Sequence, residues 1–314
     1  MLDTSLQQHR DLLAGRAVRL WGDGFELSHV ADSGNAVFIA SRSGMRFILR
    51  LTNPAYRSRF ECEGELAFLL HLGACGCRVA LPLPSRSGAM TEEAREGEAV
   101  LVASLFRWAP GLLVSPGERF WNRPFFQEWG RSLGEIHRAA RTFRGAEKGG
   151  RWEWRDEVLM TKASELIPAD EPDVRERFQK VMQAMDRLLP TDEYYGMTHG
   201  DFAPQNFRYD PLNGIMAFDF GNCCHHFFAS DVAIAFTALR RRPEEEQRVA
   251  REAILAGYRQ ISPFTDEQEA TLPLMHRLRV HYVYLSRLYK FGPHPDPHEA
   301  ETLAALRQWV LQEG

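Results

Sequence analysis

Lysine is missing from the first 147 of the 314 residues, and the chain as a whole lacks a basic excess because its net charge is −4. A general nucleic-acid binder is therefore excluded, since affinity for a phosphate backbone comes from concentrated Lys and Arg. No apolar run is long enough to span a bilayer, and no signal-peptide pattern is visible. These absences predict a soluble protein of the cytoplasm without a membrane or nucleic-acid partner.

Disulfide-framework spacing is also absent. The five cysteines form an odd set, which is typical of reduced thiols inside a cell. Cys223-Cys-His-His226 puts four metal-ligand types in a row, and zinc is one interpretation of it. Adjacent residues seldom all converge on one ion, so the pattern favours a loop with some buried side chains.

Polar residues with a distinctive spacing stand out in the second half of the chain. His199-Gly200-Asp201 is followed by Asn206 and then by Asp219-Phe220-Gly221. The pattern supplies two carboxylates and a carboxamide, which together suit a metal-bound triphosphate and an acceptor hydroxyl. Phosphoryl transfer needs positioning and charge neutralisation more than an activated nucleophile. The spacing therefore indicates a phosphotransferase site.

The local structure around these residues follows from turn chemistry. Pro204 forbids a continuing helix or central strand, so residues 201–206 are predicted to form a loop. A turn over residues 210–214 and a short apolar strand over 215–218 then lead to Asp219. Such a hairpin would bring Asn206 and Asp219 together as oxygen ligands of Mg²⁺, leaving Asp201 to orient the acceptor hydroxyl.

These motifs resemble the signature of the aminoglycoside phosphotransferase and choline kinase superfamily, which includes a bacterial phosphotransferase enzyme family. Other segments resemble further parts of that superfamily's fold, namely Phe47-Ile-Leu-Arg50 in the small lobe, Glu65-Leu-Ala-Phe-Leu69 in the next helix and Leu133-Gly-Glu-Ile-His137 in the large lobe. The resemblance covers roughly residues 20–290.

The resemblance implies an α+β, protein-kinase-like fold with two lobes. The small lobe, over residues 1–106, would hold an antiparallel sheet, one main helix and the nucleotide. The larger, mostly helical lobe, over residues 107–314, would hold the catalytic loop and the acceptor pocket. The superfamily uses ATP and Mg²⁺, with the first aspartate of the motif as base. Carried over, Asp201 is the base, whereas Asn206 and Asp219 hold the metal.

Arg50 stands where the superfamily's small-lobe strand normally carries a lysine. Arginine also binds phosphate and never loses its charge, although its geometry differs from that of an ammonium. Arg46 lies on the same predicted strand face and is the alternative cation. The expected partner of Arg50 is Glu65 on the following helix, with Glu61, four residues earlier, as the second choice.

Two further segments are candidates for nucleotide contact. Ser33, Gly34 and Asn35 lie between two predicted strands, where their backbone N–H groups could bind phosphate, but the same residues also suit an ordinary hairpin turn. Residues 100–106 form an apolar strand before a Pro-Gly break. By analogy with kinases, backbone groups near Ser104 to Arg107, including those of Ser104 and Phe106, would meet the adenine ring.

The large lobe is predicted to be mostly helical from its start signals. The signals are Pro124, Pro172, the Pro243-Glu-Glu-Glu246 turn and capping boxes at Thr265 and Asp296. Asp231 resembles a superfamily aspartate that fixes the catalytic loop, and it also suits a helix N-cap. In the segment 277–289, aromatic and arginine side chains could contact an acceptor, although Leu278, Tyr282 and Leu285 at helical spacing suggest core.

Three functional hypotheses follow. The first is an ATP- and Mg²⁺-dependent kinase of a small-molecule hydroxyl, or, with the same fold, a bacterial Ser/Thr protein kinase. The second is a nucleotide-binding pseudokinase, suggested by Arg50. The third is a metal-dependent phosphohydrolase, which needs more histidine ligands than are placed here. The sequence assigns neither the acceptor, nor ATP over GTP, nor the oligomeric state.

Overall fold

The computed structural model describes residues 4–32, 34–144 and 150–313. Contacts divide the chain into two compact units. The first, called here the sheet unit, comprises Met1–Leu113, Phe143–Arg151 and Phe207–Gly221. The second, the helical unit, comprises Val114–Thr142, Trp152–Asn206 and Asn222–Gly314. The lobes predicted at residues 1–106 and 107–314 stay a prediction, because compactness alone assigns no role to either unit.

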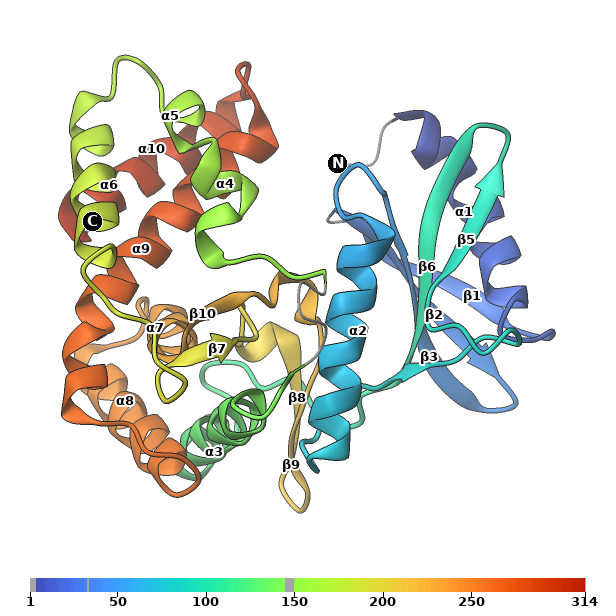
Figure 1. The fold of residues 1–314 in the computed structure, drawn as a ribbon, viewed down its shortest axis with the longest axis horizontal. Helices are drawn as coiled ribbons and strands as arrows, with labels where there is room; N and C mark the ends of the chain where they lie inside the picture. The colour runs from blue at the N-terminus through green and yellow to red at the C-terminus, as the bar shows by residue number, and fades with distance from the viewer. Residues whose placement is uncertain (1–3, 33, 145–149, 314) are drawn as a thin grey trace. The chain divides into compact units, whose positions relative to one another are not determined.

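The sheet unit is built on a six-stranded antiparallel sheet with the order β1-β2-β3-β6-β4, in which β5 also pairs with β6 (Figure 1). Its strands are β1 (Glu26–Asp32), β2 (Asn35–Arg42), β3 (Met45–Thr52), β4 (Pro82–Leu83), β5 (Glu92–Glu96) and β6 (Ala99–Arg107). The central strand β3 carries alternate residues to opposite faces, as a pleated strand must. Leu49 and Leu51 therefore belong to the core on one face, while Arg50 points to the other.

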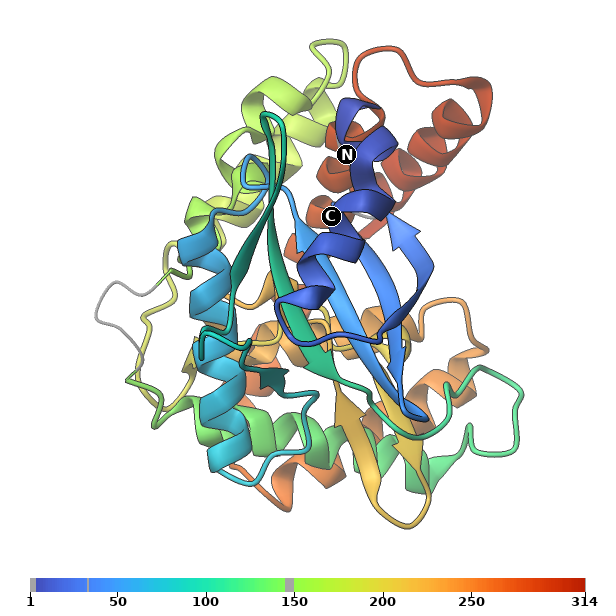
Figure 2. The ribbon, with the colours of Figure 1, turned by 90° about the vertical axis from the view of Figure 1, so that its right-hand side faces the viewer.

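Helix α1 (Thr4–Arg19) covers the Leu49 face of the sheet and lies across its strands in Figure 2. Leu13, Ala17 and Val18 of this helix are buried in the core with the strand residues. The sequence predicted one main helix in this part of the chain, and α1 is an additional one. Its helical signal is weak because its sequence is mostly polar, so packing on the sheet stabilises it.

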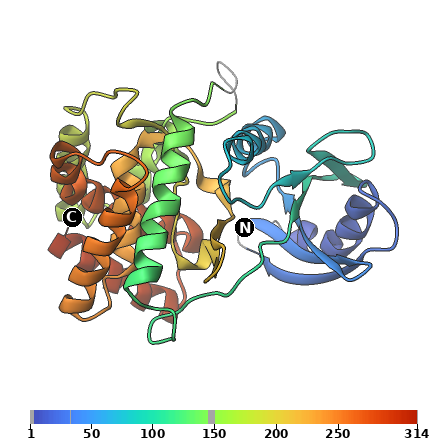
Figure 3. The ribbon, with the colours of Figure 1, turned by 90° about the horizontal axis from the view of Figure 1, so that it is seen from below.

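Helix α2 (Arg59–Ala74) lies on the opposite side of the sheet from α1 (Figures 1 and 3). Ser58 begins it with a capping box, in which the Ser58 hydroxyl accepts from Glu61 N–H and Glu61 accepts from the Ser58 backbone. The Glu61 side chain is therefore engaged in the cap at the start of the helix. Glu65, one turn later, is buried and faces β3.

A short hairpin completes the sheet unit. Strands β8 (Phe207–Asp210) and β9 (Gly214–Ala217) pair antiparallel from Phe207↔Ala217 to Asp210↔Gly214, which confirms the predicted turn and apolar strand. Isolated bridges join Tyr209 to Leu112 and Ala217 to Val79. Asp219 follows two residues after this hairpin.

Helices dominate the helical unit. They are α3 (Arg123–Ala140), η1 (Trp154–Asp156), α4 (Val158–Thr161), α5 (Ala163–Leu166), α6 (Pro172–Met185), η2 (Pro204–Asn206), α7 (Phe228–Ala238), α8 (Glu244–Arg259), α9 (Asp266–Phe291) and α10 (Pro297–Glu313). A two-stranded ribbon joins β7 (Tyr195–Met197) to β10 (His225–Phe227), and the short helix η3 (Phe220–Asn222) precedes β10. The capping boxes at Thr265 and Asp296 are present, and Pro124 and Pro172 lie in first turns, as predicted.

Helices α3 and α8 pack side by side in the helical unit (Figure 3). Their approach depends on glycine: a Cβ atom at Gly257 would lie 1.9 Å from the Gln127 carbonyl oxygen, and one at Gly130 would lie 1.8 Å from that of Ile254. At these two points the backbones of α3 and α8 thus lie closer together than any residue with a Cβ atom permits.

All five cysteines lie in the described part of the chain and are free. None of the helices that the structure describes has both the length and the hydropathy needed to cross a bilayer.

Candidate active site

Arg50 and Glu65 form a buried ion pair in the sheet unit. The Arg50 Nη1 and Nη2 atoms donate to the two Glu65 carboxylate oxygens at 2.8 Å each, so the pair is bidentate. The residues are only 6% and 2% exposed. Burial by itself would lower the pKa of Arg50, but the Glu65 carboxylate raises that pKa above its ordinary value. The predicted choice of Glu65 over Glu61 as the partner is confirmed.

Asp219 lies close to this pair. A Cβ atom placed on Gly221 would be 3.4 Å from Asp219 Oδ1 and 3.9 Å from Arg50 Nη1, so both groups surround the same glycine. Asp219 has a φ of 63°, a left-handed backbone conformation that non-glycine residues seldom adopt. Strain of this kind persists only where the surrounding structure enforces it, and it gathers at functional sites.

The other predicted nucleotide contacts also belong to the sheet unit. Ser33 lies outside the described residues; Gly34 lies against the Tyr56 ring, and Asn35 begins β2. The Asn35 Oδ1 atom is buried without a hydrogen-bond partner among the described residues. Ser104 is buried on β6 opposite Arg50, and the Arg50 guanidinium lies 4.9 Å from the centre of the Phe106 ring. These positions leave their nucleotide roles as predictions.

The His199-Gly200-Asp201 loop in the helical unit is held by Asp231 in the first turn of α7. Asp231 accepts hydrogen bonds from the backbone N–H of His199 at 2.7 Å and of Gly200 at 2.9 Å. A third contact, 3.1 Å long, comes from Nε2 of the buried His137. Burial opposes ionisation of Asp231, but the His137 and His199 contacts hold its pKa below the usual value. The loop-fixing role suggested by resemblance is therefore seen in the hydrogen bonds.

Position 200 requires glycine, because of its backbone conformation and the close approach of the Asn222 backbone. Gly200 has a φ of 80°, and a Cβ atom there would lie 2.2 Å from the Asn222 carbonyl oxygen. Only glycine satisfies both conditions, which explains why it precedes Asp201.

Asp201 contacts two side chains of the helical unit. Asn206 Nδ2 donates to Asp201 Oδ2 at 2.9 Å and to the Asp201 backbone carbonyl at 2.8 Å. Arg279 Nη2 donates to Asp201 Oδ1 at 2.6 Å. The structure thus brings Asp201 and Asn206 together. Asp219 belongs to the sheet unit, so the predicted meeting of Asn206 and Asp219 stays a prediction.

The contact from Arg279 was missed by sequence reasoning. Arg279 lies on α9, 78 residues after Asp201, within the segment 277–289 that had suggested acceptor contact. Leu278 and Leu285 of that segment are buried, as expected for core positions, while Tyr282 is half-buried and lies 5.3 Å beneath the Arg279 guanidinium. The aromatic and cationic composition was the only available signal.

Cys223 and Cys224 precede β10 and are buried, while His225 and His226 begin this strand and are partly buried. No group of three or more His, Cys, Asp or Glu side chains suited to a metal occurs in residues 4–32, 34–144 and 150–313. His226 Nδ1 accepts from Phe227 N–H, and its ring stacks on Trp154 with centroids 5.1 Å apart.

Comparison with known proteins agrees with this arrangement. The model of the family described as "Phosphotransferase enzyme family" matches residues 28–268. Amicoumacin kinase of Bacillus subtilis (strain 168) is 30% identical over 225 residues, which span 71% of this chain and 66% of the relative, somewhat under two thirds. Homoserine kinase of Rhizobium etli is 30% identical over 277 residues, spanning 83% of this chain and 79% of the relative.

A solved structure of an amicoumacin kinase in complex with AMP-PNP, Ca²⁺ and Ami superposes with a TM-score of 0.86 at 26% identity. The match covers 99% of this chain and 93% of that one. The chain combines an antiparallel sheet unit with a mostly helical unit in which Asp231 anchors the His-Gly-Asp loop, and this is the kinase-like α+β fold of the phosphotransferases that it resembles. The chain belongs to the phosphotransferase enzyme family, as its motifs predicted.

Proposed function

We propose that this protein transfers the γ-phosphoryl group of ATP to a hydroxyl of a small-molecule acceptor, with Mg²⁺ as the metal, in the cytoplasm. The observation that carries the proposal is the fixed position of the Asp201 carboxylate. This carboxylate stands on a loop fixed through two backbone bonds to Asp231, and it is oriented by Asn206. A fixed carboxylate suits the alignment of an acceptor hydroxyl for attack.

Asp201 is assigned as the base that accepts the hydroxyl proton while the new O–P bond forms and the bond from the γ-phosphorus to the bridging oxygen breaks, so that ADP leaves. Phosphoryl transfer needs only modest proton abstraction, so the main contribution of Asp201 is to aim the hydroxyl. Arg279 holds the Oδ1 atom in place, while each carboxylate oxygen keeps a second lone pair for an acceptor.

Asn206 and Asp219 are assigned as the magnesium ligands. Asn206 uses its Nδ2 atom for both bonds to Asp201, so its Oδ1 oxygen, which makes no hydrogen bond to the described residues, is available to a cation. Carboxylate and carboxamide oxygens are the ligand types that Mg²⁺ prefers. The β8–β9 hairpin starts one residue after Asn206 and ends two residues before Asp219, with Phe207 and Ala217 as partners. Bound Mg²⁺ would supply neutralisation of charge on the phosphate oxygens.

The nucleotide is assigned to the small lobe over residues 1–106. Arg50, kept in place by Glu65, supplies the cation for its phosphates. We assign the backbone of Ser33, Gly34 and Asn35 to the phosphates as well, and the strand at Ser104 to Phe106 to the adenine. Free cysteines agree with a cytoplasmic location.

The proposal is tested by ADP release from Mg-ATP over a panel of hydroxylated acceptors, with phosphorus NMR to identify the product. Asp201→Asn should lower turnover by about 10³-fold or more while nucleotide binding, measured by calorimetry, stays unchanged. Asp219→Asn should instead weaken Mg-dependent nucleotide binding. The matched control is Asp192→Asn, at an exposed position, which should change neither quantity.

Two results would count against these roles. Loss of nucleotide binding in Asp201→Asn would remove Asp201 from its role as base. Binding of Mg-ATP without product on any acceptor, in the unchanged protein, would instead identify a pseudokinase.

A further inference from the structure

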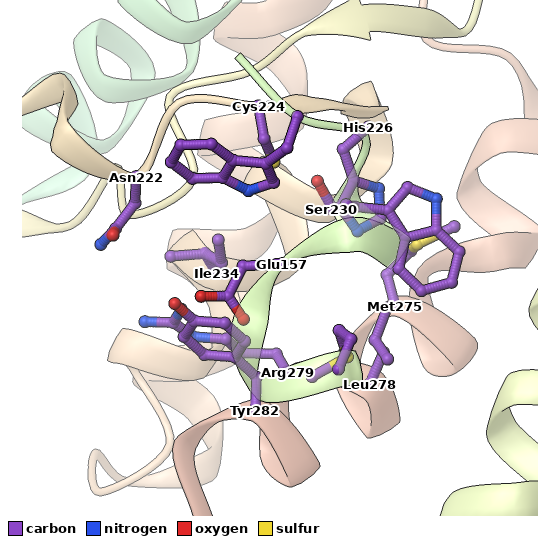
Figure 4. A pocket seen from close by; sticks show the side chains of 14 residues that line it. Glu157, Asn222, Cys224, His226, Ser230, Ile234, Met275, Leu278, Arg279 and Tyr282 are labelled. Atoms are coloured by element: carbon purple, nitrogen blue, oxygen red, sulfur yellow. The ribbon is translucent and has the colours of Figure 1, made fainter. Parts of the chain in front are cut away.

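A pocket opens within the helical unit and contains about 590 Å³ of space free of protein atoms, part of it open to solvent (Figure 4). Its walls come from residues 152–160, from the segment between Asn222 and Ile234, and from α9. Gly200 also lines it, so the pocket reaches the loop that carries Asp201.

Arg279 connects the pocket to Asp201. Its side chain lines the pocket, while its Nη2 atom donates to Asp201 Oδ1 at 2.6 Å. The Arg279 Nε atom is buried without a hydrogen-bond partner among the described residues. Arg279 is therefore a polar group that the pocket wall shares with the proposed base.

Most of the pocket wall is apolar or aromatic. Two indoles, Trp152 and Trp154, and the Tyr282 ring line it together with Met160, Ile234, Met275 and Leu278. His226 extends this wall by stacking on Trp154. Burial lowers the pKa of His226 to about 3, so the imidazole is neutral at physiological pH and adds no positive charge. Such walls favour a flat or apolar ligand body.

Glu157 is the one carboxylate among the lining residues. It is 8% exposed, and its side chain is fixed because Oε2 accepts the Leu159 N–H at 2.6 Å at the start of α4. A carboxylate among aromatic rings binds an ammonium group through both charge pairing and cation–π attraction.

We infer that this pocket is the acceptor site and that its acceptor is a hydroxylated compound with a single amine and a flat or apolar body. The inference rests on the proposed function, because it takes Asp201 as the group that receives the acceptor hydroxyl. The amine pairs with Glu157, the body lies along the tryptophans and Tyr282, and the hydroxyl points toward Asp201.

The same features select against other amines. A polyamine sugar brings several ammonium groups into a pocket whose wall has one carboxylate and one guanidinium, while the nearby Asp201 carboxylate is already paired with that guanidinium. Most charges of the sugar are thus left unpaired and desolvated. A short amino alcohol satisfies Glu157 but leaves the aromatic walls uncovered. Selection therefore depends on both the charge and the apolar body.

Four compounds separate the contribution of the charge from that of the apolar body in a binding experiment without nucleotide. Binding is monitored by tryptophan fluorescence. Phenylethanolamine has the amine, the hydroxyl and the ring; styrene glycol has a second hydroxyl in place of the amine; isopropanolamine lacks the ring; kanamycin is a polyamine sugar. Phenylethanolamine should bind about tenfold more tightly than each of the other three. Tighter binding of kanamycin or of styrene glycol would overturn the inference.

Glu157→Gln provides the matched variant, because the carboxamide oxygen can still accept the Leu159 N–H. It should reduce the preference for phenylethanolamine over styrene glycol from about tenfold to about one, with styrene glycol binding unchanged. Glu165→Gln, on the exposed surface of α5, should keep the tenfold preference. A ratio of two affinities within one variant does not depend on the fraction of folded protein. An unchanged preference in Glu157→Gln would overturn the assignment.

These outcomes are separate from those of the proposed function. Compound preference is measured without ATP, so it can be present in a protein that transfers no phosphate. Conversely, efficient phosphorylation of kanamycin in the ADP-release assay would support the proposed function and refute this acceptor class.

Discussion

Arg50 is the proposed phosphate contact, and its buried ion pair with Glu65 also affects the stability of the fold. Each charge is buried, so removing one partner leaves the other without compensation. We expect Arg50→Ala to lower the free energy of unfolding by about 3–5 kcal/mol, measured by urea denaturation. The double variant Arg50→Met/Glu65→Leu should be more stable than Arg50→Ala, since it removes both charges. A double variant as unstable as the single one would show that packing, and not charge, is lost.

Asp231 has the corresponding role in the helical unit. In Asp231→Asn, an NH₂ group replaces one carboxylate oxygen. This group is itself a donor, and it must face other donors, among them the backbone N–H groups of His199 and Gly200. We expect a loss of about 3 kcal/mol in the free energy of unfolding, because a buried donor is left unsatisfied. Asp192→Asn, at an exposed position, should stay within about 0.5 kcal/mol of the unchanged protein. Equal effects of the two substitutions would contradict the role given to Asp231.

At the scale of elements, the contact between α3 and α8 gives a paired prediction with opposite signs. Gly257→Ala places a methyl group 1.9 Å from the Gln127 carbonyl oxygen, so the helices must separate, and we expect the melting temperature to fall by several degrees. Gly15→Ala in α1 meets no atom within 4 Å. There the better helix propensity of alanine should stabilise the protein by about 0.5–1 kcal/mol. A stabilising Gly257→Ala would show that the helices are not in such close contact.

Elements with local signals were predictable from the sequence, whereas those that depend on tertiary packing were not. The turn over residues 210–214 and the capping box at Thr265 act within a few residues, and both are present as expected. Within the loop predicted over residues 201–206, the structure places the short helix η2, which begins at Pro204. Helix α1 lacks such a signal because its burial on the sheet supports it. The contact between Arg279 and Asp201 joins residues 78 positions apart, and no periodicity or spacing encodes that distance.

At the scale of the whole molecule, the histidines His226 and His137 set the response to acid. His226 has a folded-state pKa of about 3, below its ordinary value of 6.5, and burial also lowers the pKa of His137. The unfolded chain takes up a proton as the pH falls through 6.5, but folded His226 does not, so stability is lost between pH 6.5 and 3. Asp231, whose pKa is also lowered, adds to this loss at the acidic end.

We therefore expect the free energy of unfolding to fall by about 2 kcal/mol between pH 6.5 and 5 for His226 alone, measured by urea denaturation at each pH. His226→Phe keeps an aromatic ring against Trp154 but has no imidazole to protonate. Its free energy of unfolding should therefore fall by about 2 kcal/mol less over the same pH range. A pH dependence identical to that of the unchanged protein would show that His226 protonates as easily in the folded state as in the unfolded chain.

The guanidinium of Arg50 has a practical consequence for chemical surveys of nucleotide-binding proteins. Reagents that carry an acyl phosphate on a nucleotide mark their targets by acylating a lysine amine close to the phosphates. Here the cation on β3 is an arginine, and residues 1–147 contain no lysine at all. Under the proposed binding mode such a reagent would occupy the protein without modifying this part of the chain, so proteome-wide labelling would count it, and relatives with the same substitution, as non-binders.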